Sequence, residues 1–224
     1  EIRTTRWSDD GLPAERLASA KSYVTFLKSK LIQVVEQALE DLQLADVSFC
    51  RARCGFAMNR RLPSPNGYRN FPNPNGPVDH DVPVLSVRST AGKLRGILFG
   101  YACHNTTLGF YQFCGDFAGF AQLAIEEANP GAIALYLQGC GADINPYPRG
   151  TLELAKQHGQ SLATAVQSAL DTVATPLVGE LRTSYGKATV EYSTPPTKDE
   201  LVARTNSSNK YVAIHGQRLL TQLV

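Results

Sequence analysis

The stretch LRGILFGYACH, residues 94–104, decides the fold, because an apolar run of strand length ends on a histidine. A run this apolar is typical of a strand that is buried on both faces of a sheet. A second strand, Val82 to Arg88, precedes it across the turn Thr90-Ala91-Gly92-Lys93. We therefore expect a buried sheet with His104 at the end of one strand.

Helical patterns alternate with these strands. Pro13 to Gln43 and Thr151 to Ala174 repeat apolar residues at three- and four-residue intervals, which predicts two long amphipathic helices. Asp116 to Asn129 predicts a shorter helix, and Ala132 to Gln138 predicts another buried strand. The order predicts an α/β fold, with a largely buried mixed central sheet and flanking long amphipathic helices.

Four further segments complete the prediction. Val47 to Cys54 alternates as a strand does, and the proline-rich stretch Arg60 to Pro77 is expected to be a loop. Leu177 to Tyr192 predicts a strand pair bent at Gly186, and Thr197 with Glu200 predicts a capping box that opens a helix.

Composition excludes two classes of protein. The net charge of the 224 residues is +2 and the basic residues are scattered, so we expect no nucleic-acid partner. No uncharged apolar run approaches the roughly 20 residues that span a bilayer, so we expect no transmembrane segment. The chain starts at Glu1 and ends in the apolar run Leu219 to Val224, and we expect it to be an internal piece of one domain, residues 1–224, truncated at both ends.

The cysteines leave the compartment open. There are five, without the paired spacing of a structural zinc site: Cys50, Cys54, Cys103, Cys114 and Cys140. Most are expected to be small core residues, while Cys50 and Cys54 are candidates for a disulfide in an oxidising compartment.

Polar residues follow two of the predicted buried strands, and active groups in α/β folds gather at such strand ends. His104 ends the first strand, and burying its ring is costly unless both nitrogens find partners. A metal is one such partner, but spacing alone favours a core histidine bonded to a backbone carbonyl, because no second histidine lies at ligand spacing.

After the second strand, Asp143 and Asn145 present polar groups from a turn, or only stabilise an Asx-type turn before Pro146. Gly139-Cys140-Gly141 before them matches no full phosphate-binding motif. Arg60 is either an ordinary solvated arginine or a fork that orients an anion.

Six segments in order resemble the N-terminal catalytic domain of the neutral/alkaline (non-lysosomal) ceramidases, best over Leu12 to Ala174. They are Met58-Asn59-Arg60, Asn73-Pro74, Val78 to Val87, Cys103 to Leu108, Gly115 to Ala121, and Ala142 to Pro146.

The resemblance implies a zinc-dependent hydrolase that cleaves the amide bond of N-acyl sphingoid lipids or a related amide. It makes His104 a Zn²⁺ ligand, with the remaining ligands expected outside this chain, and places Arg60 and Asn59 at the substrate. Asp143 and Asn145 match the catalytic turn, with Asn145 where the family has a serine. An amide side chain cannot act as a covalent nucleophile, but it can donate a hydrogen bond to an oxyanion or orient water.

By resemblance we also expect a lipid-like amide substrate, a secreted, periplasmic or cell-surface location, and further N- and C-terminal parts of the same protein. Two alternatives remain open: a hydrolase of a different amide or ester on the same scaffold, and a non-catalytic binding relative.

Overall fold

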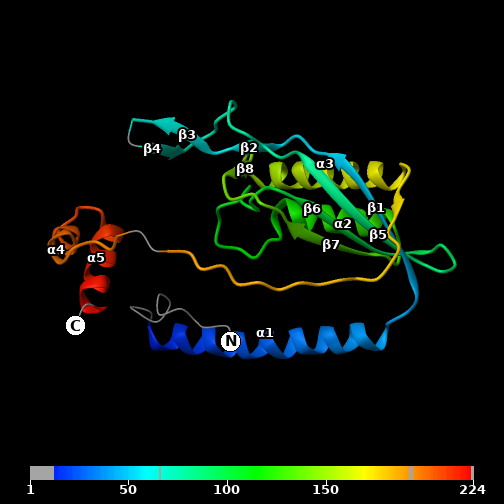
Figure 1. The fold of residues 1–224 in the computed structure, drawn as a ribbon, viewed down its shortest axis with the longest axis horizontal. Coiled ribbons are helices and arrows are strands. Elements are labelled where there is room, and N and C mark those ends of the chain that lie inside the picture. The colour runs from blue at the N-terminus through cyan, green and yellow to red at the C-terminus, as the bar shows by residue number, and fades with distance from the viewer. Residues whose placement is uncertain (1–12, 66, 192–193, 223–224) are drawn as a thin grey trace. The chain divides into compact units, whose positions relative to one another are not determined.

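A computed structural model describes residues 13–65, 67–191 and 194–222 (Figure 1). The chain forms two compact units, residues 1–179 and residues 180–224. That both belong to one catalytic domain stays a prediction. None of the helices in the described ranges is both long and apolar enough to span a membrane.

The first unit is built on a five-stranded mixed sheet in the order β7-β6-β5-β1-β9, as the sequence predicts for the fold class (Figure 1). Its strands are β1 (Ala45–Arg53), β5 (Asp81–Ser89), β6 (Leu94–Tyr101), β7 (Ile133–Gln138) and β9 (Thr175–Pro176). β6 and β7 pair in parallel, while the other neighbours are antiparallel. The predicted turn between β5 and β6 is present.

Two helices pack against each other and against this sheet: α2 (Asp116–Ala128) and α3 (Leu152–Leu170). Thr151 caps α3, since its side chain accepts a hydrogen bond from the Leu154 N–H at 3.2 Å. Both helices contribute apolar side chains to one core, with strand residues such as Val84 and Phe99. We call this side of the sheet the covered face.

The other side, the open face, carries a row of apolar side chains. The register pairs Phe49 with Leu85, Leu85 with Leu98, and Leu98 with Leu135 across four strands. Leu135 is 54% exposed, whereas its neighbour Ala134 is buried. The prediction that Ala132 to Gln138 is buried is therefore wrong for the open-face residues Ile133, Leu135 and Leu137, because α2 and α3 cover only the other face, and Gln138 at the strand end is exposed as well.

Two short pairings lie outside the main sheet. β3 (Arg61–Ser64) and β4 (Gly67–Asn70) form a hairpin, so the prediction of a loop from Arg60 to Pro77 is wrong for these residues. β2 (Ala57–Asn59) pairs antiparallel with β8 (Ile144–Pro146), and neither strand was predicted.

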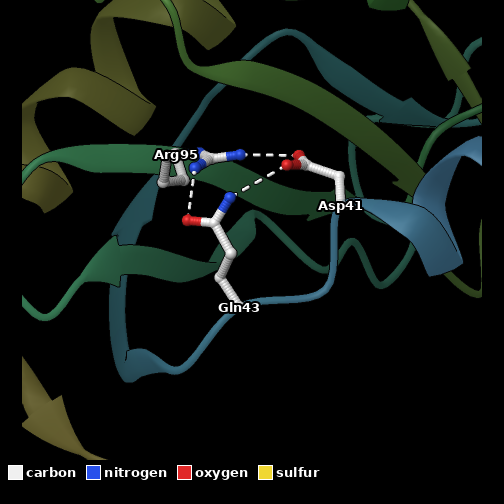
Figure 2. Close-up of polar contacts among 3 residues, drawn as sticks. All are labelled: Asp41, Gln43 and Arg95. Carbon is white, nitrogen blue, oxygen red and sulfur yellow. Dashed lines mark hydrogen bonds and ion pairs between the residues drawn. The ribbon is translucent and has the colours of Figure 1, made fainter.

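Helix α1 (Ala14–Glu40) matches its prediction and contains no buried residue in the described part of the chain. A polar network ties its C-terminal end to β6 (Figure 2). Arg95 donates to the Asp41 carboxylate at 2.7 Å and to the Gln43 side-chain oxygen at 3.0 Å, and Gln43 donates to Asp41 at 2.9 Å. Such an exposed network contributes about 1 kcal/mol at most.

The second unit is a pair of helices, α4 (Lys198–Thr205) and α5 (Lys210–Gln222). The predicted capping box opens α4: the Glu200 N–H donates to the Thr197 hydroxyl, and the Thr197 N–H donates to the Glu200 carboxylate. That backbone N–H lowers the pKa of Glu200. Gly216 lets α5 approach α4 closely, because a Cβ there would lie 3.0 Å from the Leu201 carbonyl oxygen.

The strand pair predicted for Leu177 to Tyr192 is wrong for residues 177–191, which form no strand, and Tyr192 lies outside the described residues. Within the described ranges these residues belong to no strand pair, and the side chains of Val178 and Leu181 are exposed.

Candidate functional site

The site lies where β2 and β8 bring two distant parts of the chain together. Met58 pairs with Asn145 in this ladder, and the Arg60 N–H donates to the Asp143 carbonyl oxygen at 2.8 Å. The end of β6 joins the same point, since the His104 N–H donates to the Ile144 carbonyl oxygen at 3.2 Å. Three segments therefore converge through backbone hydrogen bonds.

Glycines permit this approach. A Cβ on Gly141 would lie 2.7 Å from the Cys103 nitrogen, and a Cβ on Gly139 would lie 3.2 Å from the Ala102 Cα. The separation at Gly141 is too short for a side chain, and the separation at Gly139 is tighter than most Cβ contacts. The two glycines thus allow the strand ends to pack closely.

His104 is half-buried and both of its ring nitrogens contact protein groups. Nδ1 lies 2.7 Å from the Gly141 carbonyl oxygen, and Nε2 lies 3.1 Å from Arg60 Nη2. A carbonyl only accepts and a guanidinium only donates, so Nδ1 carries the proton and Nε2 is the acceptor. This arrangement is a neutral imidazole of defined tautomer.

Arg60 links the predicted site residues. Its Nη1 donates to Asn145 Oδ1 at 3.2 Å, and its Nη2, besides contacting His104, donates to the Ala142 carbonyl oxygen at 2.8 Å. Its Nε is buried and has no hydrogen-bond partner in the described part of the protein. The side chain is held in place and retains an unused donor.

Asn145 is oriented by two donors. Its Oδ1 accepts from Arg60 and from the Thr106 hydroxyl, the latter at 3.3 Å. Because the oxygen is engaged, the amide nitrogen is the atom left to donate to a bound molecule. The side chain is 8% exposed.

Asn59 and Asp143 form a second pair. The Asn59 amide nitrogen donates to the Pro77 carbonyl oxygen at 3.0 Å and to the Asp143 carboxylate at 3.1 Å, while its oxygen accepts from the Arg61 N–H. Both N–H groups of Asn59 are thus used within the protein. In the structure it positions its neighbours, and its predicted contact with substrate stays a prediction.

Two hollows flank this point. A cavity of about 270 Å³ is lined by Arg60 and Asn145, whereas Asp143 lines a different and more open hollow of about 430 Å³. The structure therefore brings together Arg60, His104 and Asn145, and separates Asp143 from the cavity that Asn145 lines. The catalytic roles predicted for Asn145 and Asp143 stay predictions.

The loop after His104 is held by Asp116, the first residue of α2. Its carboxylate accepts from the Leu108 N–H at 3.0 Å and from the Phe117 N–H at 2.7 Å. Asp116 adopts φ = 51°, a left-handed conformation that aspartate tolerates better than most residues. This contact fixes the segment that carries Thr106.

Cys103, next to His104, is a core residue. Burial raises the pKa of its thiol, and the nearby Asp116 carboxylate raises it further. A thiol kept protonated is a poor nucleophile. All five cysteines are free, and Cys50, Cys54 and Cys103 are buried, so no disulfide joins Cys50 to Cys54.

Two residues of the site were not predicted. Thr106 lies in a segment singled out by sequence, but nothing there indicated its contact with Asn145. Arg149 lines the 270 Å³ cavity and donates to the Thr106 carbonyl oxygen at 3.3 Å. A single arginine in a loop after Pro148 gives no signal in a sequence.

The residues present do not by themselves fit a zinc ion. No group of three or more His, Cys, Asp or Glu side chains lies close enough to hold a metal within residues 13–65, 67–191 and 194–222. His104 has the tautomer that a metal ligand needs, with Nδ1–H bonded to a carbonyl. The unprotonated nitrogen of His104, Nε2, however, contacts the cationic guanidinium of Arg60.

The comparisons with known proteins concern the fold. No family model matches the chain, and no curated protein matches it. Among solved structures, the neutral ceramidase from Pseudomonas aeruginosa is similar at a TM-score of 0.55 and 18% identity, over 66% of this chain and 26% of that chain. A ceramidase complexed with C2 is similar at 0.54 and 18%, over 65% and 25%.

The chain thus spans about a quarter of the length of these solved proteins. The likeness agrees with the resemblance found in the sequence. The part of this chain that aligns has the fold of a segment of the neutral ceramidases.

Proposed function

We propose that the protein is a ceramidase-like hydrolase that cleaves the amide bond of N-acyl sphingoid lipids or of a related N-acyl compound. The observation that carries the proposal is that one side chain, Arg60, contacts both His104 and Asn145. Arg60 and Asn145 line a cavity, as a small-molecule site requires, and His104 contacts Arg60 without lining that cavity. The fold shared with neutral ceramidases supports the same class of reaction.

The chemistry follows from which donors are unused. Asn145 offers its amide N–H₂ to an oxygen that becomes negative when the carbonyl is attacked, and the guanidinium of Arg60, which lines the same cavity, adds positive charge beside it. Neither residue is a nucleophile, so water is the attacking group. If the contact of His104 Nε2 with Arg60 Nη2 is exchanged for that water, the imidazole takes the proton of the water and returns it to the leaving amine nitrogen as the C–N bond breaks.

Zinc bound through His104 is a separate proposal, and none of these steps depends on it. When bound, zinc supplies a water whose pKa is lowered to about 7. Binding requires that His104 Nε2 exchange the Arg60 contact for the metal and that further ligands come from residues other than the described ones. The resemblance in sequence is what supports it.

One observation favours a second candidate, a binding relative without catalysis. Both ring nitrogens of His104 contact protein groups, which is the arrangement of a structural histidine. The two candidates differ in turnover and in metal content.

Replacing Asn145 by Ala tests the hydrolase. Deleting one oxyanion donor reduces turnover by roughly 10²–10³-fold, so the Asn145→Ala protein should lose that much activity on a short-chain acyl-sphingosine and on a panel of simple amides and esters. Asn75→Ala, an exposed asparagine of the proline-rich segment, is the matched control and should retain full activity. Full activity in Asn145→Ala would end the assigned role, and no turnover on any substrate would favour the binding relative.

Metal content of the purified protein, measured by mass spectrometry, tests the zinc proposal. His104→Ala should lower zinc occupancy, whereas His215→Ala in the second unit should not. Equal zinc in both variants would show that His104 is not a ligand.

A further inference from the structure

We propose that the 270 Å³ cavity beside Asn145 binds an anionic group, a carboxylate or a phosphate, carried by the N-acyl substrate. This inference rests on the proposed function, and it defines the substrate more narrowly: an acylated amine with a negative charge is preferred over a neutral one. The specificity-determining residue is Arg149.

The cavity lies between the β2–β8 ladder and the chain that follows β4. Six of its lining residues come from the ladder and from the residue after each strand: Met58, Asn59, Arg60, Asn145, Pro146 and Tyr147. Phe71 enters from the end of the β3–β4 hairpin, where its N–H donates to the Arg60 carbonyl oxygen at 3.1 Å. The walls are therefore fixed by backbone hydrogen bonds on two sides.

The charge lining this cavity is positive and uncompensated. Arg60 and Arg149 line it, and no aspartate or glutamate does. Neither arginine forms an ion pair within 4.0 Å with any acidic side chain of the described ranges. Two like charges at one cavity repel each other, and a bound anion relieves that repulsion.

Arg149 and Asn145 keep donors that an anion can use. Arg149 has five N–H donors and uses one of them, on the Thr106 carbonyl oxygen. The buried Nε of Arg60 has no partner in the described part of the chain, and Asn145 keeps its amide N–H₂. Arg149 is exposed, so its remaining N–H groups are open to a ligand, whereas the Nε of Arg60 is enclosed by protein atoms.

The two arginines are joined by a short relay. Arg149 donates to the Thr106 carbonyl, the Thr106 hydroxyl donates to Asn145, and Asn145 accepts from Arg60. An anion held by Arg149 therefore lies next to the group that we propose as the oxyanion donor. The rest of the lining is largely apolar, with Met58, Phe71, Pro72 and Pro146.

The size of the cavity limits what it holds. Its 270 Å³ falls just below the range of about 300–1,000 Å³ that is usual for drug-sized ligands. It accommodates a charged head group and the atoms next to it, and not a whole lipid chain.

Equilibrium binding of matched probes tests the inference without any need for hydrolysis. The first pair is N-octanoylglycine and N-octanoylglycinamide, which differ in charge and hardly in shape. The second pair is N-octanoylethanolamine phosphate and N-octanoylethanolamine. Calorimetry at low ionic strength should show the charged member binding roughly ten-fold more tightly, with the preference reduced by added salt. The pair with the larger ratio identifies the anion as carboxylate or phosphate.

Variants assign the preference to one residue. Arg149→Gln should reduce the ratio to about two or less, whereas Arg149→Lys should retain most of it because the charge remains. Arg69→Gln is the matched control, since Arg69 is exposed on the neighbouring hairpin and does not line the cavity. Equal affinities within each pair, no binding of any probe at millimolar concentration, or an unchanged ratio in Arg149→Gln would overturn the inference.

The two proposals fail in different ways. If the charged probes bind preferentially but no amide or ester is hydrolysed, the hydrolase fails and the anion site stands. If amides are hydrolysed and the wild-type protein binds charged and neutral probes equally, the hydrolase stands and the anion site fails.

Discussion

The two faces of the central sheet carry similar apolar residues and have different surroundings. On β6, Phe99 points into the core against α2 and α3 and is fully buried, while the adjacent Leu98 belongs to the row on the open face. On β7 the contrast is sharper, since Ala134 is 1% exposed and Leu135 is 54% exposed. Apolar composition therefore indicates that a face is suited to packing and does not show that it is packed.

The covered face and the candidate site depend on different kinds of contact. Burial of an apolar side chain stabilises a fold by about 1.5–3 kcal/mol, and the covered face provides most such burial in the first unit. The candidate site lies at the strand ends and is held by polar contacts. Substitutions on the two faces test whether this division is right.

The largest effect is expected for Phe99→Ala on the covered face. Phe99 packs edge-on against Tyr136, with ring centroids 5.6 Å apart, and its removal leaves a cavity. The free energy of unfolding should fall by about 3–5 kcal/mol, as measured by denaturant titration. Phe49→Ala on the open face is the matched control, and we expect about 1 kcal/mol there. Equal losses would mean that the two faces are equally packed.

The next largest effect is expected from alkaline pH, which should lower the free energy of unfolding through a buried group of the covered face. Burial raises the pKa of the Cys103 thiol above its usual value of 9.0, so the folded protein keeps a proton that the unfolded chain loses. Stability is therefore complete below pH 9 and falls as pH rises toward the raised value. This one thiol accounts for about 1.4 kcal/mol per pH unit, or roughly 3 kcal/mol by pH 11.

Unfolding curves from pH 8 to 11 measure the effect. Cys103→Ala should flatten the decline, whereas Cys114→Ala, which removes an exposed thiol, should leave it unchanged. A slope that Cys103→Ala does not alter would show that this thiol is not the group responsible. The hydroxyls of Tyr101 and Tyr136, whose pKa values burial also raises from 10.0, add to the decline above pH 10 in every variant, so the comparison is made between pH 9 and 10.

A smaller effect is expected where α2 and α3 cross. A Cβ on Gly159 would lie 2.5 Å from the Phe120 Cβ and 2.9 Å from the Phe117 carbonyl oxygen. Gly159→Ala should therefore destabilise the protein by about 1–3 kcal/mol through overpacking.

Gly119 on the facing helix has open space around its Cβ position, so Gly119→Ala should stabilise by about 0.5–1 kcal/mol. Thermal unfolding tests the close crossing: Gly159→Ala should lower the melting temperature and Gly119→Ala should raise it.

The smallest effect is expected for Leu135→Ser on the open face. With over half of its surface exposed, this side chain contributes little to the folded state, and the change in unfolding free energy should stay within about 0.5 kcal/mol. A loss above about 1.5 kcal/mol would show that another part of the molecule covers the open face in solution.

Periodicity predicted the elements whose packing is repetitive. The helices α1, α2 and α3 and the strands β1, β5 and β6 lie where their patterns place them, within a few residues, and the capping box at Thr197 is present. The hairpin β3–β4 was missed because five prolines suggested a loop, although Pro63 fits within an isolated two-stranded hairpin. Residues 177–191 alternate as a strand does, but strands need partners, and the sequence does not show whether one exists.

The candidate site was predictable in part. Polar residues at the ends of two apolar strands indicated His104 and Asn145, and the resemblance added Arg60. The contacts of Thr106 and Arg149 depend on how the loops after β6 and β8 pack against each other, and no local sequence pattern predicts that packing. The Asp143 carboxylate is held by Asn59 and lines a different hollow from Asn145, and the β8 pairing is too short to give a periodic signal in the sequence.

The β2–β8 ladder has a consequence for the order in which the molecule folds. Arg60 and Asn145 are 85 residues apart in the chain, and the entropy of closing so long a loop must be recovered by contacts made elsewhere. Those contacts are in the β5–β6 hairpin and the α2–α3 pair, which join segments much nearer in sequence. We therefore expect the cavity to take shape after the sheet and its helices have assembled, because it depends on contacts between distant parts of the chain.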